Sequence, residues 1–109
     1  MKKISLCLLL FTASLFAAEV KTITIPSTKM KKDVPATLIL PDSYKDGKQK
    51  YPVLYLLHGA GDNHQKWSKA TTIADLADQY QMIVLCPDGG GKSWFFDSPI
   101  DPNFQYETH

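Results

Sequence analysis

The sequence predicts an α/β fold organised around a strand–loop–helix–strand unit. Two near-continuous apolar runs, residues 52–57 and 82–86, indicate strands that are covered on both faces, as is typical of a parallel sheet. Residues 58–81 separate these runs, and parallel neighbours need a crossover of at least about a dozen residues. The apolar content of 44% and the charged content of 21% are typical of a globular chain.

Two further strands are expected before this unit. Residues 20–25 alternate apolar and polar side chains, which is the period of a half-buried strand. Residues 34–40 are the second strand, and residues 43–50 form a polar connector after it. Four strands with one crossover leave a sheet edge unpaired and one face open. Residues 19–109 are therefore expected to be the N-terminal portion of a larger domain.

The crossover is expected to contain one helix. Its apolar positions fall at i, i+3, i+4 and i+7 and are Ile73, Leu76, Ala77 and Tyr80. Thr71 or Thr72 is expected to cap the first turn, where Asp75 also places a negative charge near the positive end of the helix dipole. From Pro87 onward no periodicity remains.

The first 18 residues have the order of a secretory signal peptide. Lys2 and Lys3 give a cationic start, an apolar run extends from Ile4 to Phe16, and small residues follow before Glu19. The run is short for a bilayer span, although an uncleaved anchor is the alternative. The expected product is an exported domain, periplasmic or secreted, with no stable membrane span.

Composition narrows the choice of partners and of cysteine chemistry. All twelve basic residues are lysine, and removal of the leader leaves ten of them against eleven carboxylates. Nucleic-acid binders need a basic face and the bidentate contacts of arginine, so this class is excluded. Cys86 is then the only cysteine, so no internal disulfide can form. Core packing is its expected role, and a catalytic thiol is the weaker alternative.

Two glycine-bearing loops follow the two apolar runs, where ligands bind in open α/β sheets. The first, HGAGDN at 58–63, fails as a dinucleotide fingerprint because His64 occupies the position of the third glycine. The second, PDGGGKS at 87–93, fails as a phosphate loop because Cys86 stands at the leading glycine position and an aromatic run replaces the helix. A tight turn without function is the simple alternative for the first loop.

Several segments together carry a family resemblance. They are YPVLYLLHG at 51–59, Trp67, IVLCPDG at 83–89, MKKDVPA at 30–36, LP at 40–41, SP at 98–99 and YET at 106–108. In this combination the chain resembles the putative-esterase family of α/β-hydrolases, which includes S-formylglutathione hydrolases, feruloyl and acetyl xylan esterases, and mycolyltransferases. The resemblance implies that residues 19–109 form the N-terminal part of an α/β-hydrolase fold.

The resemblance also implies a function. The family's enzymes are serine carboxylic-ester hydrolases that act on acyl esters, including carbohydrate-linked ones, through a Ser–Asp/Glu–His triad and without a cofactor. No serine of this chain stands in a Gly-x-Ser-x-Gly frame, so the chain alone is expected to be inactive. The implied oxyanion-hole donor is the backbone N–H of Ala60, with Gly59 and Gly61 setting the loop geometry. Trp94 is the candidate for a substrate-binding wall, with plain packing as the alternative.

The remaining polar residues of these loops are given structural roles. His58 is expected to be a hydrogen-bonding residue rather than a general base, because the family's catalytic histidine comes last in the chain. His64 and His109 are expected to be exposed, and the spacing of His and Cys predicts no metal site. Asp62 and Asp88 fall in turns, where aspartate commonly bonds its own backbone.

Two other functions stay open. A non-catalytic secreted binding module with the esterase fold would hold a polysaccharide on exposed aromatic side chains, and the sequence after it would lack a nucleophile elbow. A small nucleotide-binding protein would gain thermal stability from ATP.

Overall fold

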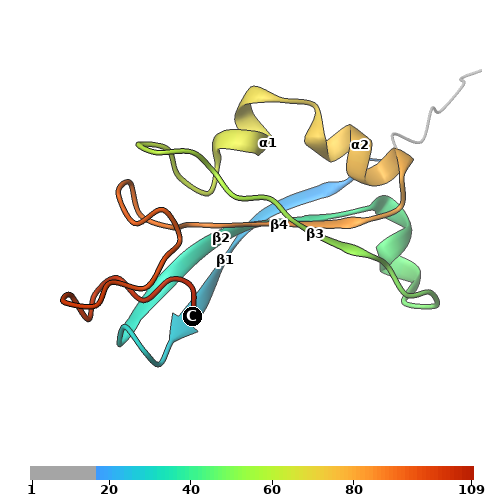
Figure 1. The fold of residues 1–109 in the computed structure, drawn as a ribbon. Helices are drawn as coiled ribbons and strands as arrows, with labels where there is room; N and C mark the ends of the chain where they lie inside the picture. Colours follow the sequence, from blue (N-terminus) through green and yellow to red (C-terminus); the bar gives the residue numbers. More distant parts are fainter. Residues whose placement is uncertain (1–16) are drawn as a thin grey trace, which may run out of the picture.

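The computed structural model describes residues 17–109, which form a four-stranded mixed sheet with its two α-helices on one face (Figure 1). The strands lie in the order β1-β2-β4-β3. Their bounds are β1 Glu19–Ser27, β2 Lys32–Leu40, β3 Val53–Tyr55 and β4 Ile83–Pro87. All four expected strands are thus confirmed. The expected signal peptide lies outside the described residues except for Ala17 and Ala18.

β1 and β2 form an antiparallel hairpin. Its register pairs Ile23 with Ala36 and Ile25 with Val34, so the apolar residues of the alternating pattern share one face. At the turn the Met30 N–H donates to the Ser27 hydroxyl at 3.2 Å. No helix in this described part of the chain is long and apolar enough to cross a bilayer.

The crossover joins parallel strands, as predicted. β3 runs parallel to β4, with Leu54 opposite Val84. The expected helix is α2, Ile73–Gln79, which carries Asp75 in its first turn. The Thr71 hydroxyl accepts the Ile73 N–H at 3.3 Å, so Thr71 is the threonine that bonds the helix start.

Two short elements were missing from the sequence-based expectation. One is α1, Lys66–Ala70, and the other is the 3-10 helix η1, Asp42–Asp46. Each has only five residues, which is too short for a helical period to show in the sequence. Gly47 ends η1 in the left-handed conformation, which a residue without a Cβ adopts readily.

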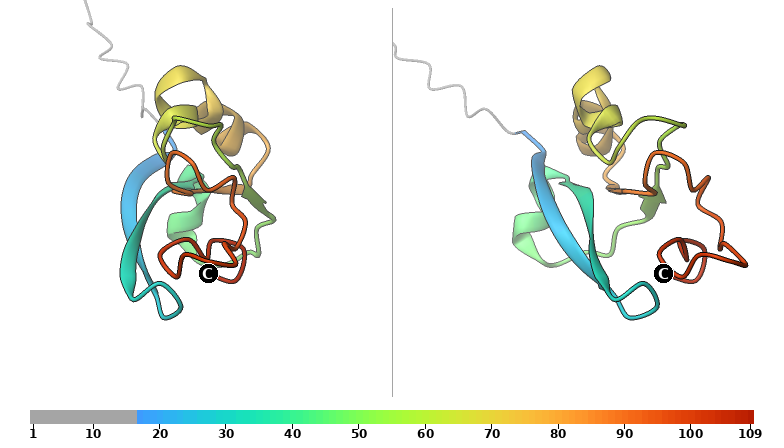
Figure 2. Two further views of the ribbon diagram at one scale, coloured as in Figure 1. Left: turned by 60° about the vertical axis from the view of Figure 1, so that its left-hand side comes forward. Right: turned by 90° about the vertical axis from the view of Figure 1, so that its left-hand side faces the viewer.

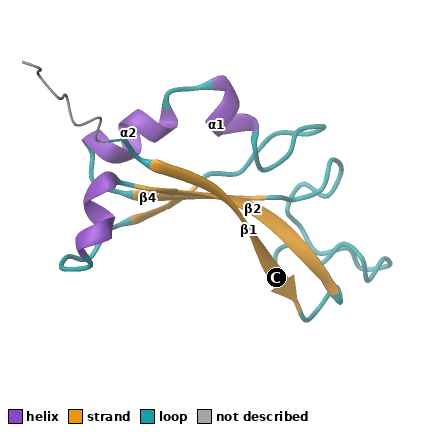
Figure 3. Ribbon diagram, turned by 180° about the vertical axis from the view of Figure 1, so that it is seen from behind, coloured by secondary structure: helices purple, strands orange, loops and turns teal. Residues whose placement is uncertain are grey.

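The hydrophobic core lies between the sheet and its two α-helices (Figure 3). Its buried members are Ile39, Ala77, Val84 and Cys86, and the neighbours that pack against them include Leu56 and Trp67. Burial raises the pKa of the Cys86 thiol above its ordinary value of 9.0. A neutral buried thiol behaves as a small apolar side chain, so the predicted packing role of Cys86 is confirmed.

Strand β3 departs from the prediction that both of its faces are covered. It is the last strand in the sheet, so within residues 17–109 nothing pairs with its outer edge. Val53 and Tyr55 share a face with Ile83 and Leu85, away from the helices, and are 47% and 66% exposed. The apolar run predicted cover on both faces, whereas the strand count predicted an unpaired edge and an open face, and within residues 17–109 the second expectation holds.

The predicted apolar stripe of α2 is also only partly buried. Ala77 is fully buried and Ile73 packs against the core, but Leu76 and Tyr80 are exposed. Because α2 shares this face of the sheet with α1, only the narrow side of its apolar stripe contacts the core.

The segment from Asp97 to Thr108, called the C-terminal loop below, is ordered although it has no helix or strand. It lies beside the start of β2 (Figure 2), where the Lys32 ammonium donates to the Asn103 carbonyl at 2.8 Å and to the Tyr106 hydroxyl at 3.1 Å. The Asp97 carboxylate accepts the N–H groups of Glu107 and Thr108 at 3.0 and 3.1 Å.

Candidate active site

Two loops meet where the parallel strands β3 and β4 end. We call residues 56–65 the β3–α1 loop and residues 88–96 the β4 loop. The Gly61 N–H donates to the Gly91 carbonyl at 3.0 Å, and the His64 N–H donates to the Asp88 carboxylate at 3.2 Å. These two bonds join the loops along their length, so the conformation of one loop depends on that of the other.

His58 makes a third connection between the loops. Its Nε2 accepts the Gly89 N–H at 2.9 Å, and its Nδ1 lies 2.8 Å from the Gly59 carbonyl. The Gly89 N–H can donate only to an unprotonated nitrogen, and the Gly59 carbonyl can accept only from a protonated one, so the two bonds together need a neutral ring with its proton on Nδ1. The side chain is 8% exposed. The hydrogen-bonding role predicted for His58 is what the geometry shows.

Ala60, the predicted oxyanion donor, lies at the exposed tip of the β3–α1 loop. No atom of residues 17–109 accepts a hydrogen bond from its backbone N–H. The preceding Gly59 carbonyl, in contrast, also accepts the Asp62 N–H at 3.2 Å. Gly61 has φ of +78°, a conformation that favours glycine and lets the chain reverse direction after Ala60.

A cavity of about 220 Å³ opens between the two loops. It is lined by Leu57, His58, Gly59, Ala60, Gly90, Gly91, Trp94 and Phe95. The predicted residues Gly59, Ala60 and Trp94 therefore meet in one place, whereas Gly61 supports the loop from outside the lining. The volume falls below the range of about 300–1,000 Å³ that is usual for small-molecule sites, so the cavity is a partial pocket.

The aromatic wall of the cavity is held by an unusual turn. The Phe96 N–H donates to the Ser93 carbonyl at 3.2 Å, and the two residues between them, Trp94 and Phe95, have φ of +55° and +59°. These values are those of a type I′ turn, which normally takes Asn or Gly because other side chains are strained there. The turn leaves Trp94 71% exposed at the cavity rim.

Gly89 and Phe95 contact His58 beside the cavity, and neither was singled out from the sequence. The Phe95 ring lies 5.1 Å from the His58 ring, centroid to centroid. A Cβ on Gly89 would approach the Phe95 ring to 2.5 Å, so any larger residue here would require that ring to move. The three successive glycines at 89–91 were the available signal, but they do not show which of them faces an aromatic ring.

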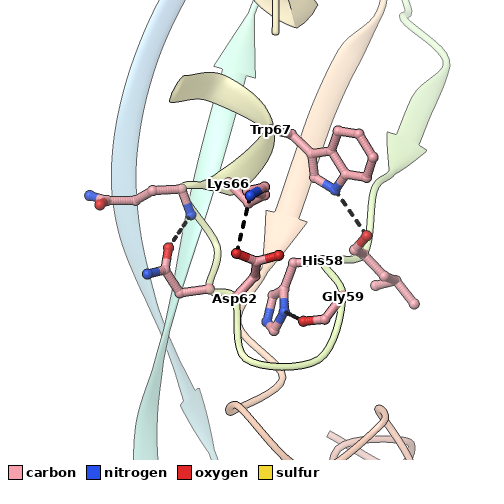
Figure 4. A network of polar contacts seen from close by, with 8 residues as sticks. His58, Gly59, Asp62, Lys66 and Trp67 are labelled. Carbon is pink, nitrogen blue, oxygen red and sulfur yellow. Dashed lines mark hydrogen bonds and ion pairs between the residues drawn. The ribbon is translucent and has the colours of Figure 1, made fainter. Parts of the chain in front are cut away.

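Side chains around the β3–α1 loop fix its two ends (Figure 4). The Trp67 indole N–H donates to the Leu57 carbonyl at 2.9 Å, and the Lys66 ammonium pairs with the Asp62 carboxylate at 3.4 Å. Trp67 lies within α1 and so ties the start of the β3–α1 loop to that helix. The i, i+4 pair is exposed, so its contribution to stability is small.

Two predictions for the polar residues have different outcomes. Asp88 bonds its own turn as expected, since its carboxylate accepts the Gly90 N–H at 2.8 Å. His64 is not solvent-exposed as predicted but half-buried, and its Nδ1 lies 2.8 Å from the Thr37 hydroxyl. The prediction failed because the fold of the β3–α1 loop brings His64 back over β2, a contact between distant residues that local sequence cannot show.

The site has no feature of a metal or phosphate centre. Among residues 17–109 no group of three or more His, Cys, Asp or Glu side chains is placed to hold a metal ion. After the β4 loop the chain enters a turn and the C-terminal loop, not the helix that a phosphate loop requires.

Comparisons with known proteins identify the family. The family model described as "Putative esterase" matches residues 27–108. The chain belongs to this esterase family. An esterase of Mycobacterium tuberculosis is 39% identical over 59 residues, which cover 53% of this chain and 13% of that protein.

Solved structures of esterases share the fold. A ferulic acid esterase superposes with a TM-score of 0.72 at 31% identity, covering 85% of this chain and 40% of the other. The S-formylglutathione hydrolase of Agrobacterium tumefaciens has a TM-score of 0.71 at 17% identity over the same shares. The chain therefore has part of an α/β-hydrolase fold, as the sequence predicted, and spans well under half of the length of these esterase relatives.

Proposed function

We propose that this chain forms the oxyanion-loop portion of a serine carboxylic-ester hydrolase. The observation that carries the proposal is the Ala60 N–H, which faces no acceptor within residues 17–109 on a loop that lines the cavity. A fixed N–H of this kind can stabilise the alkoxide that forms when an ester carbonyl is attacked. Loss of one such donor lowers kcat by about 10²–10³-fold in enzymes where it has been removed.

The chain is proposed to need further sequence for catalysis. The serines outside the leader are Ser27, Ser43, Ser68, Ser93 and Ser98, and none has the Gly-x-Ser-x-Gly context of a nucleophile elbow. In the α/β-hydrolase order the nucleophile, the acid and the histidine all come after the strands present here. The second oxyanion donor follows that serine, so it is absent as well.

The substrate is proposed to be an acyl ester, with carbohydrate-linked esters included. One similar protein is a ferulic acid esterase, and a feruloyl esterase of Anaeromyces mucronatus, 25% identical, has been solved with ferulic acid bound. In this chain the aromatic rings of Trp94 and Phe95 beside Ala60 supply a flat apolar wall for an acyl group. Export through residues 1–18 belongs to the same proposal, and fractionation of cells that express the tagged chain tests it.

The experiment joins this chain to the part of the fold that it lacks. Residues 19–109 replace the matching portion of the ferulic acid esterase, and the product is called the grafted esterase below. The grafted esterase is expected to hydrolyse p-nitrophenyl acetate, whereas residues 19–109 alone are expected to give no turnover above background. Ala60→Pro removes the N–H and should lower kcat by about 10²-fold or more.

Ala60→Gly is the matched control, because it changes the same side chain and keeps the N–H. Its kcat should stay within about fivefold of the parent. The proposal is overturned if a folded Ala60→Pro graft retains the kcat of the parent, or if residues 19–109 alone turn over the ester in a manner that requires one of their own serines.

A non-catalytic binding module is the second candidate, favoured by the exposure of Trp94 at the cavity rim and of Phe96 further along the same loop. It predicts that residues 19–109 bind a soluble xylan, and that Trp94→Ala abolishes the binding. The esterase proposal predicts no such binding without an ester group.

A further inference from the structure

We propose that His58 is a positioning residue that aims the Ala60 N–H by fixing the peptide group between Gly59 and Ala60. This inference rests on the proposed function of Ala60 and goes beyond it, because it states what controls the direction of the donor. The tautomer of His58 and its two hydrogen bonds set this direction, and the loss of one bond is expected to lower kcat separately from the melting temperature.

The peptide group between Gly59 and Ala60 links the direction of one carbonyl to that of one N–H. In a trans peptide the C=O of one residue and the N–H of the next point in opposite directions from the same plane. The Gly59 carbonyl and the Ala60 N–H form such a pair, and the described chain has no cis peptide bond. Whatever holds the Gly59 carbonyl therefore sets the direction of the Ala60 N–H.

The carbonyl side of this peptide is held twice. The His58 Nδ1–H donates to the Gly59 oxygen at 2.8 Å (Figure 4), and the Asp62 N–H donates to the same oxygen at 3.2 Å. The opposite side, with the Ala60 N–H, has no acceptor among residues 17–109. One side of the peptide is thus bonded to the protein and the other is left for a ligand.

The His58 ring is itself contacted by the β4 loop. The Gly89 N–H donates to Nε2 at 2.9 Å, and the Phe95 ring packs 5.1 Å away at an interplanar angle of 60°. Rotation of the ring would leave the buried Gly89 N–H without a partner, which is unfavourable. The β4 loop therefore orients the ring, and the ring orients the peptide.

The same bonds remove His58 as a general base. Nδ1 carries the proton and its bond points at Gly59, while the lone pair of Nε2 is taken by the Gly89 N–H. No lone pair is left to accept a proton from a nucleophile without the loss of one of these bonds.

Two substitutions separate the two bonds in the grafted esterase. In His58→Asn the side-chain amide can donate from the position of Nδ1 but cannot reach Gly89. In His58→Gln the side-chain oxygen can accept from Gly89 near the position of Nε2 but leaves the Gly59 carbonyl without its donor. His58→Ala removes both bonds, and His64→Ala is the matched control because it removes a neighbouring half-buried ring whose hydrogen-bond partner is Thr37.

The expected result is a dissociation between stability and rate. His58→Ala should lower kcat at least about tenfold with KM changed less than about threefold, since an oxyanion donor acts in the transition state. His58→Asn should recover most of kcat but not the melting temperature, and His58→Gln should recover the melting temperature but not kcat. His64→Ala should lower the melting temperature and leave kcat within about twofold.

The inference is overturned if kcat follows the melting temperature across the three His58 variants, or if His58→Gln recovers kcat and His58→Asn does not. Nitrogen-15 NMR of the His58 ring in the parent graft gives a test that needs no variant and no activity. A proton on Nε2 overturns the inference. A proton on Nδ1, together with a Gly89 amide that is protected from hydrogen exchange, supports it. A folded parent graft without esterase activity counts against the proposed function of Ala60 instead.

Discussion

The two edges of the sheet differ in the side chains that they present. β1 ends the sheet with Lys21, Thr22, Thr24 and Pro26 exposed, a mixture of charged, polar and proline residues that discourages pairing with another strand. β3 ends it with Val53, Leu54 and Tyr55 exposed. The first edge is suited to water, and the second has the composition of a strand inside a sheet. The difference supports the proposal that the β3 edge is where the remainder of an esterase domain attaches.

The largest expected effect comes from a charge placed on each edge. Tyr55→Lys should destabilise the grafted esterase by about 2–4 kcal/mol, because a strand paired on both sides buries this position and leaves the ammonium without a partner. Thr22→Lys on the β1 edge should change the free energy of unfolding by less than about 0.5 kcal/mol. Urea denaturation of both variants measures the difference between their free energies of unfolding. Equal destabilisation by the two variants would show that the β3 edge is no more buried in the grafted esterase than the β1 edge.

The second prediction concerns how the loop at the end of β3 depends on β4. Gly89→Ala should destabilise the grafted esterase by about 1–3 kcal/mol, since the added Cβ would lie 2.5 Å from the Phe95 ring. Gly91→Ala is the control, because its Cβ would meet only the Gly61 Cα, at 3.9 Å. Thermal melts of the two variants should differ clearly, and a neutral Gly89→Ala would show that the Phe95 ring is not held where the structure places it.

A smaller loss of stability is expected from the contact between the C-terminal loop and the hairpin of β1 and β2. The Lys32 ammonium lies 5.6 Å from the Phe104 ring centroid and 5.0 Å from that of Tyr106, besides its two hydrogen bonds. Lys32→Met should cost about 1 kcal/mol and speed proteolysis within residues 97–108. Lys48→Met, at an exposed lysine between η1 and β3, is a control that should change neither. Unchanged proteolysis in Lys32→Met would show that other contacts hold the loop.

The smallest effect concerns the buried thiol of Cys86 in the core, and it is expected to change stability only at alkaline pH. Burial raises the pKa of its thiol above 9.0, so the stabilising contribution of the neutral thiol is complete below pH 9.0 and is lost as the pH rises toward the folded-state pKa. Stability should therefore fall more steeply above pH 9 in the parent graft than in Cys86→Ala. Equal alkaline slopes for the two proteins, measured by urea denaturation, would contradict the burial of this thiol.

The sequence predicted the secondary structure well where the signal is local. Alternation gave β1, and apolar runs gave β3 and β4, because these patterns follow from which side chains face the core. The helix repeat from Ile73 to Tyr80 located α2, although only part of its stripe is buried. The unpaired edge and open face followed from the number of strands, but the order of the strands depends on partners far apart in the chain, so the local pattern did not contain it.

The candidate site was predicted in the same uneven way. Gly59, Ala60 and Trp94 were singled out and do line one cavity. The Gly89 N–H bonds to His58, 31 positions away, and His64 contacts Thr37, 27 positions away. The Phe95 ring likewise packs against the distant ring of His58. A single sequence shows that such residues exist but not that they meet.

The most direct test of the central claim is a crystal structure of the grafted esterase after reaction with a phosphonate ester, whose phosphoryl oxygen stands in for the alkoxide. The account predicts that the Ala60 nitrogen lies about 2.7–3.1 Å from that oxygen, with the His58 Nδ1–H still bonded to the Gly59 carbonyl. An Ala60 N–H that points away from the phosphoryl oxygen, with other groups holding that oxygen, would contradict it.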